Sequence, residues 1–169
     1  PRRDPSFNWK EAVDGSNPAT DWLGLHTLDE TVGGHNPKSG YLNNTNNWPW
    51  MMAGPKHSPK ASDYPSYMEN YPENYRGIHA IELLDGKKDF TIDSLAAAAY
   101  DNHLTAFDVL LPILYTAYNI TPAAELAEQI ALLKAWDHRS SVNSNATSLA
   151  VFWGQELRRK AAENEIAQA

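Results

Sequence analysis

Residues 34–50 read GHNPKSGYLNNTNNWPW, and this stretch differs in character from the rest of the chain. A turn rich in proline and glycine precedes Gly40-Tyr41-Leu42, a candidate for a short strand, and a cluster of asparagines then lies beside two tryptophans. Asparagine side chains carry a donor pair and an acceptor, so they can brace a tight turn or direct an N–H group at a ligand. The chemistry by itself favours a self-bracing loop, and a sugar-binding loop is a further alternative.

The chain around this stretch is predicted to be irregular. Nine of the eleven prolines lie at or before Pro72, and four of the six tryptophans lie in the first fifty residues. A weak helix around Trp9 to Val13 is the only helix that we expect there. Because tryptophans need apolar surface and long structureless segments are rare in compact domains, we expect residues 1–72 to lie against another polypeptide or other parts of the same protein.

Residues 73–169 are predicted to be helical. Alanine occurs four times before residue 73 and eighteen times after it, and apolar residues recur there at helical spacing. The apolar positions expected to lie on one face of each helix are Ile78, Ile81 and Leu84; Ile92, Leu95, Ala99, Phe107, Leu110 and Leu111; Leu126, Ile130 and Leu133; and Leu149, Phe152 and Trp153.

Caps and prolines predict where these helices begin and end. Pro112 lacks a backbone donor and clashes one turn back, so we expect it to kink or break a helix near Leu111. The other expected boundaries are Pro72, Thr91 and Thr121 with Pro122 as helix starts, Gly86 as a stop, and the Ser/Asn-rich loop 140–145 before the last helix.

Composition excludes several classes of protein. With 42% hydrophobic and 21% charged residues, the 169-residue chain is typical of a folded protein and not of a disordered tail. The net charge of −7 argues against a nucleic-acid-binding surface, which needs clustered Lys and Arg. The chain has no cysteine for disulfides, thiolate nucleophiles or zinc ligation. No apolar run approaches the roughly 20 residues needed to span a bilayer.

Spacing alone finds no catalytic motif. The sequence has no Gly-x-Ser-x-Gly elbow, no phosphate-binding glycine loop and no His-Glu-x-x-His. A metal site is one interpretation of His26, Asp29, Glu30 and His35, but their spacing matches no tight ligand pattern, and loop residues of this kind usually satisfy backbone groups. Two further polar triplets are interpreted as residues of helix surfaces or helix ends: Asp101-Asn102-His103 and Asp137-His138-Arg139.

Taken in order, residues 34–50 resemble the asparagine motif of the penicillin-acylase-like branch of N-terminal nucleophile hydrolases. This branch includes penicillin amidases, cephalosporin acylases and acyl-homoserine-lactone acylases. Its pattern is Asn-Pro, a short spacer, Gly-aromatic-x-x-Asn-x-Asn-Asn/Asp, then Pro and often Trp. The matching residues are Asn36-Pro37, Gly40-Tyr41, Asn44-x-Asn46-Asn47 and Pro49-Trp50.

The resemblance continues in the family's order from about Asn36 to Leu157, through a linker rich in Pro and Tyr and the arginine-bearing segment Tyr75-Arg76-Gly77-Ile78. It implies a mainly α chain with an irregular N-terminal third and little strand, as a helical segment of an α/β fold of the αββα type. We therefore expect an irregular segment at 1–72, with the Asn motif at 34–50, and a helical segment at 73–169. Together they would be one fragment of a larger enzyme.

The resemblance also implies roles for particular residues. In the family, a Ser hydroxyl attacks an amide carbonyl while its own α-amine accepts the proton, and water then hydrolyses the acyl-enzyme. The second Asn of Asn-x-Asn, here Asn46, would donate its side-chain amide to the oxyanion, and Arg76 would steady it. Asn44, Trp48 and Trp50 would bind substrate. No cofactor is expected, although some relatives bind calcium near the linker, where Asp63 is the one candidate.

The nucleophile itself has no match in this sequence, because Pro1 is not a serine and no Ser-initiated strand is found. The resemblance thus implies an internal fragment of the large β chain, inactive alone, whose partners are the α chain and the Ser-bearing part of the β chain. The parent would be an amidohydrolase acting on a linear or cyclic amide of a small N-acyl compound, in the periplasm or secreted.

Two alternatives stay open from sequence. Penicillin, cephalosporin, lactone and peptide amides all remain possible substrates, since the acyl-binding pocket lies mostly outside this segment. The competing function is a small helical binding module, in which the loop of Asn and Trp residues holds a carbohydrate or a peptide.

Overall fold

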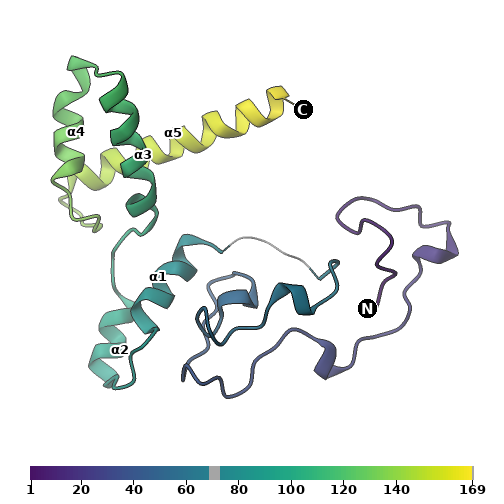
Figure 1. Cartoon of the computed structure of the whole chain (residues 1–169). Coiled ribbons are helices and arrows are strands. Elements are labelled where there is room, and N and C mark those ends of the chain that lie inside the picture. The colour runs from purple at the N-terminus through teal and green to yellow at the C-terminus, as the bar shows by residue number, and fades with distance from the viewer. Residues whose placement is uncertain (69–72, 169) are drawn as a thin grey trace. The chain divides into compact units, whose positions relative to one another are not determined.

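In the computed structural model, which describes residues 1–68 and 73–168, the chain is mainly helical and forms two compact units (Figure 1). The first unit spans Pro1–Phe90 and the second Thr91–Ala169. The described residues contain five α-helices and no sheet, which confirms the predicted fold class. The predicted segment boundary at 72/73 falls at the edge of the undescribed residues and stays a prediction.

The first unit is irregular apart from one α-helix. In this unit, short polar side chains and single-turn 3-10 helices form the hydrogen bonds that strands and longer helices would otherwise provide. Its helical elements are η1 (Pro18–Thr20), η2 (Leu28–Glu30), η3 (Pro49–Met51), η4 (Ala61–Asp63) and α1 (Tyr75–Leu84).

Two local predictions in this unit are wrong. Gly40-Tyr41-Leu42 is not a strand: Gly40 closes a turn onto Pro37 with φ of 82°, and the neighbouring Asn43 N–H reaches the carbonyl of Met52 without a ladder around it. Residues 9–11 form a turn and a bend instead of a helix, and residues 12 and 13 have no regular structure. There the side chain of Asn8 accepts the Lys10 N–H, and such side-chain bonds compete with helix formation.

Hydrogen bonds of Arg2 hold the start of the chain against residues 23–30. Its backbone N–H donates to the carbonyl of Gly24, its carbonyl accepts from Leu23, and its guanidinium contacts both carboxylate oxygens of Glu30 at 2.6 Å. Glu30 also accepts the N–H of Thr27, closing a capping box around η2. Hydrogen bonds from Arg2 and Thr27 lower the pKa of Glu30 to about 2.

Helix α1 begins at Tyr75, three residues later than predicted from Pro72, which lies outside the described residues. Asn74 is the N-cap, and its side chain accepts the N–H of Gly77. The helix ends at Leu84, two residues before Gly86, whose φ of 77° is readily adopted only by glycine. The predicted stop at Gly86 is therefore confirmed.

In the second unit, α2 (Ile92–Ala99) begins as predicted. Thr91 is its N-cap and forms a capping box with Ser94. The helix ends at Ala99, however, and the chain leaves helical geometry before α3 (Ala106–Ile120). The single long helix expected from Thr91 to Leu111 is thus two helices.

Pro112 lies inside α3, which continues to Ile120, so the predicted break is wrong, and the predicted kink stays a prediction. The side chain of Pro112 is exposed, whereas Phe107 and Leu111 on the same helix are buried in the core. Burial of two large side chains is worth about 3–6 kcal/mol, enough to offset a proline cost of about 3 kcal/mol. Packing therefore holds the helix together where local propensity opposes it.

The remaining helices are α4 (Ala127–Lys134) and α5 (Asn145–Gln168). Thr121 is the C-cap of α3 and not the start of the next helix, which begins through the 3-10 turn η5 (Ala124–Leu126). The predicted loop before the last helix is confirmed, and α4 packs against α5.

The core of the second unit lies where α3, α4 and α5 meet (Figure 1). Its buried members come from all three helices, and Leu111 is fully buried. Partly buried aromatic and aliphatic side chains, among them Trp136 and Trp153, cover this cluster. The buried residues are Phe107, Leu111, Leu133 and Ala150.

No helix among the described residues is both long and apolar enough to cross a membrane. Many large apolar side chains are nevertheless exposed on both units. The most exposed include Leu28, Trp22, Ile92, Tyr100, Ile120 and Phe152.

The Leu111→Ala substitution is expected to destabilise the second unit by about 2–5 kcal/mol, because it leaves a cavity among α3, α4 and α5. Urea unfolding of the full chain, followed by helical circular dichroism, measures this change. Ile113→Ala, on the same helix but 63% exposed, is the matched control and should change the unfolding free energy by less than about 0.5 kcal/mol. Equal effects would contradict the assigned core.

The pairing of Arg2 with Glu30 predicts a pH dependence. Since the folded pKa of Glu30 is depressed from 4.5 to about 2, its stabilising contribution is complete above pH 4.5 and is lost as the pH falls through about 2. An NMR titration of the Glu30 side chain should give a midpoint near 2, and Arg2→Ala should move it towards 4.5. A midpoint unchanged by that substitution would show that Arg2 is not the cause.

Candidate functional site

The Asn-rich loop is anchored to the first turn of α1 by Asn74. The Asn74 Oδ1 atom accepts the Gly77 N–H at 2.9 Å, which caps the helix. Its Nδ2 atom donates to the carbonyl of Thr45 at 3.1 Å, and the Thr45 hydroxyl lies 3.3 Å from Oδ1. One side chain therefore satisfies both the helix end and the loop backbone.

A second anchor joins Asn47 to Glu73. The Asn47 Nδ2 atom donates to Oε2 of Glu73 at 2.8 Å, while Oε1 accepts the N–H of Asn74 at 2.9 Å. The Asn47 Oδ1 atom accepts the N–H of Thr45 at 2.8 Å. Bonds to a charged acceptor are stronger than neutral ones, so the carboxylate holds the loop firmly against the helix.

Gly77 allows this close approach. It is buried, and a Cβ atom at this position would collide with the carboxylate of Glu73 and lie 2.9 Å from Nδ2 of Asn47. Only a residue without a side chain leaves room for both groups. Sequence reasoning did not single out Gly77, although a glycine in the first turn of a helix was the available signal.

Asn46 lies at the tip of the anchored loop with φ of 60°, in the left-handed region that asparagine tolerates better than most residues. Its backbone N–H donates to Oδ1 of Asn44 at 3.0 Å. Its side-chain Oδ1 accepts a hydrogen bond from Nη2 of Arg76 at 3.3 Å. Within the described part of the chain, its Nδ2 atom makes no hydrogen bond, and the side chain is exposed.

The structure thus brings together the two residues to which the sequence assigns catalytic roles, Asn46 and Arg76. The nearby carboxylate of Glu73 accepts hydrogen bonds from Asn47 and Asn74. The catalytic roles themselves stay predictions.

The three predicted substrate-binding residues lie in the same loop. Asn44 is exposed, and its Oδ1 atom braces the turn. Trp48 and Trp50 are half-buried, and the Trp50 ring packs against Tyr64 with ring centroids 5.7 Å apart. Their role in binding substrate also stays a prediction.

Asp63 lines a pocket of about 320 Å³, together with His26, Asp29 and Glu30. His35, the fourth residue of the loop cluster considered as a metal site, instead lies beside Asn36, whose amide contacts its ring at 3.1 Å. Among the described residues, no three ligand atoms gather at this pocket closely enough to share an ion. Since calcium takes six to eight oxygen ligands, these residues alone do not fit a calcium site.

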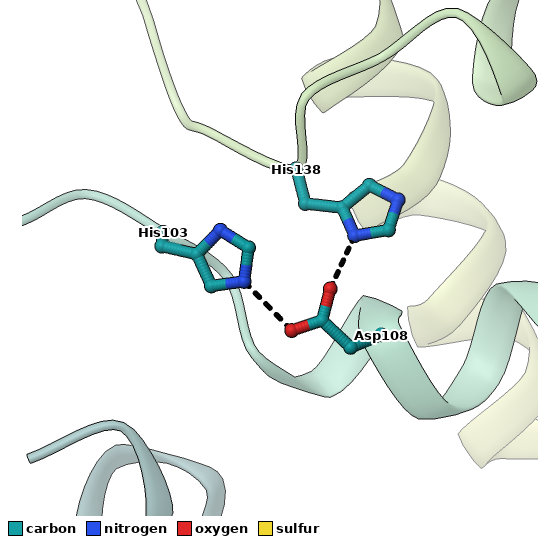
Figure 2. A group of neighbouring side chains, drawn as sticks. All are labelled: His103, Asp108 and His138. Atoms are coloured by element: carbon teal, nitrogen blue, oxygen red, sulfur yellow. Dashed lines mark hydrogen bonds and ion pairs between the residues drawn. The ribbon is translucent and has the colours of Figure 1, made fainter. Parts of the chain in front are cut away.

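A different cluster forms where the sequence indicated only surface polar residues. His103, Asp108 and His138 come together in the second unit (Figure 2). The two triplets that contain these histidines lie just after the ends of α2 and α4, as helix-end residues, and an isolated antiparallel bridge between His103 and Arg139 joins them. Partial burial raises the pKa of Asp108, but hydrogen bonds from both histidines outweigh this and hold it below its usual range.

Gly77→Ala is expected to weaken the contact between loop and helix. Alanine favours a helix over glycine by about 1 kcal/mol, but its Cβ would displace a carboxylate whose hydrogen bonds are worth about 1.5–3 kcal/mol. The loss exceeds the gain, so hydrogen exchange of the α1 amides should become faster.

Gly154→Ala on α5 is the matched control. There the nearest atoms to a new Cβ are ring carbons of Phe107 at 3.5 and 3.7 Å, which is ordinary contact distance. Exchange of the α5 amides should therefore slow or stay unchanged. Slower exchange in α1 of Gly77→Ala would contradict the proposed close approach.

Comparison with known protein families adds a finding that covers nearly the whole chain. The family model described as penicillin amidase matches residues 1–168. The match includes the anchored Asn loop, α1 and all helices of the second unit. The chain therefore belongs to the penicillin amidase family.

Proposed function

We propose that this chain supplies the oxyanion-binding part of an amide-hydrolysing acylase, with the side-chain amide of Asn46 as a donor to the oxyanion. Membership of the penicillin amidase family supports a hydrolase of the amidase type for the parent enzyme. The resemblance of residues 34–50 to the family's asparagine motif supports Asn46 as the particular residue.

The observation that carries the proposal is the bond between Arg76 and Asn46. A side-chain amide has a carbonyl end and an N–H₂ end, and a cation can bond only to the carbonyl. Because Arg76 binds Oδ1 at 3.3 Å, the N–H₂ group of Asn46 points away from the guanidinium. An amide oriented in this way presents its donors to a ligand.

Such an orientation suits the chemistry of acyl transfer. A Ser hydroxyl that attacks an amide carbonyl forms a tetrahedral intermediate, whose oxygen carries negative charge. Donors that are already oriented stabilise this charge without reorganising during the reaction. The loop anchors at Asn74 and Glu73 hold the backbone of Asn46, and Arg76 holds its side chain.

The nucleophile and the rest of the site would come from other parts of the same enzyme, namely the α chain and the Ser-bearing part of the β chain. The many exposed large apolar side chains support this, since they would be covered in a larger assembly. The chain alone would then be inactive. The family resemblance supports a periplasmic or secreted parent.

In the intact enzyme, Asn46→Ala is expected to lower kcat by roughly 10²–10³, with little change in KM, because the lost donor acts on the transition state. Turnover of chromogenic N-acyl anilides that differ in acyl chain measures this. The unfolding midpoint should fall only modestly, because the Asn46 side chain is exposed and the cost of alanine at φ of 60° is about 1–2 kcal/mol.

Asn143→Ala is the control, because Asn143 is also an exposed asparagine but lies in the loop before α5. It should retain wild-type kcat and KM. Near-normal turnover of Asn46→Ala against every anilide that the wild type hydrolyses would contradict the proposed role of Asn46 as an oxyanion donor.

A further inference from the structure

His103, Asp108 and His138 form a compact ligand set far from the Asn loop in sequence (Figure 2). The His103 Nε2 atom lies 2.7 Å from Oδ2 of Asp108, and the His138 Nδ1 atom lies 2.5 Å from Oδ1. Two imidazoles thus converge on one carboxylate from opposite oxygens. One ligand atom from each residue lies within 4.8 Å of the other two.

The backbone fixes both histidines before any ligand binds. His103 pairs with Arg139 in the antiparallel bridge, with hydrogen bonds from Leu104 N–H to the carbonyl of His138 at 2.8 Å and from Ser140 N–H to that of Asn102 at 3.0 Å. The loop before α3 and the loop after α4 are therefore joined at the cluster.

Side chains reinforce the same junction. Nη1 of Arg139 donates to Asp101 at 3.0 Å and to Asn102 at 2.9 Å, and the Asn102 amide donates to the carbonyl of Ser140. Asp108 lies in the first turn of α3, directly after the buried Phe107. The backbone of each of the three ligand residues is thus held in place by groups outside the cluster, as a preorganised site requires.

We propose that His103, Asp108 and His138 bind one divalent transition-metal ion of the zinc class, with water completing the coordination. Two imidazole nitrogens and one carboxylate oxygen are ligands that zinc prefers, and three protein ligands leave one position of a tetrahedron open. Imidazole ligands disfavour calcium and magnesium, which take oxygen donors. This site is independent of the oxyanion proposal.

Small movements suffice to admit the ion. Zn–N and Zn–O bonds of about 2.0–2.1 Å in a tetrahedron place neighbouring ligand atoms about 3.3 Å apart. The separations of 2.7 and 2.5 Å involve different oxygens of Asp108, and one ligand atom from each residue lies within 4.8 Å of the other two. Each separation must therefore change by at most about 1.5 Å, which is within reach of side-chain rotation. The side chains of His103, Asp108 and His138 are 23%, 41% and 23% exposed, so an ion can reach them from solvent.

The surroundings of His138 fit a ligand role. Its φ of 59° is a left-handed conformation, and the Arg139 N–H donates to Oδ1 of Asp137 beside it. The ring of Trp136 packs against His138 with centroids 5.2 Å apart and against Phe107 at 5.3 Å. Trp136 therefore forms an apolar wall that joins the cluster to the core.

Zinc titration of the full chain by isothermal calorimetry tests the proposal. One ion per chain is expected to bind, and His103→Gln, Asp108→Asn and His138→Asn should each weaken this binding by more than about 100-fold. Asparagine is chosen at position 138 because it tolerates the left-handed backbone. His57→Ala, an exposed histidine of the first unit, is the matched control and should bind zinc as the wild type does.

Trp136 provides a local readout. Open-shell Cu²⁺ quenches an indole close to its site, so Cu²⁺ should quench part of the wild-type fluorescence, and the Trp136→Phe variant should lose that part. Zinc binding should survive in Trp136→Phe, because the indole is not a ligand. Circular dichroism of each variant establishes that the helices are retained.

Two results would overturn the proposal. Absence of zinc binding to the wild-type chain at micromolar concentrations would leave the cluster as a hydrogen-bonded bridge between the two loops. Equal zinc affinity of the wild type and the ligand variants would mean that the ion binds elsewhere. Loss of binding in all three variants, with helices intact and the control unchanged, would establish the site.

Discussion

Residues 1–68 have to pair their backbone N–H and C=O groups without a sheet and with only single helical turns, and unpaired groups are costly wherever water is excluded. Short polar side chains form hydrogen bonds to many of these backbone groups. Asp4, Asp14 and Asn17 each accept an N–H two residues later. In the site loop, Asn44 does the same, and Asn47 accepts the N–H of Thr45, two residues earlier. The conformation of the first unit depends on this substitution of side-chain bonds for backbone ladders.

The same constraint links structure to the proposed chemistry. A loop braced by its own amides and anchored to α1 by Asn74 and Glu73 keeps Asn46 in a left-handed conformation at its tip. Arg76 then takes the carbonyl end of the Asn46 amide and leaves the N–H₂ end available. The absence of a side chain at Gly77 is what allows loop and helix to approach so closely.

Local signals were sufficient for much of the fold. Thr91 caps a helix as its sequence predicts, Gly86 follows the end of α1, and the loop before α5 lies where Ser and Asn gather. These features depend on residues within one or two turns of each other. Pro112 shows the limit of such reasoning, since the burial of Phe107 and Leu111 keeps α3 continuous through it.

The sequence by itself determined the fold class, the family resemblance and the identity of the paired residues Asn46 and Arg76, because order and spacing along the chain carry that information. Only the tertiary structure decided how Asn46 is oriented and that His103, Asp108 and His138 meet. The two histidines lie thirty-five residues apart, in loops joined by a backbone bridge between His103 and Arg139 that depends on how α3 and α4 pack. Contacts of that kind arise from the folding of distant segments onto one core, and no local pattern encodes them.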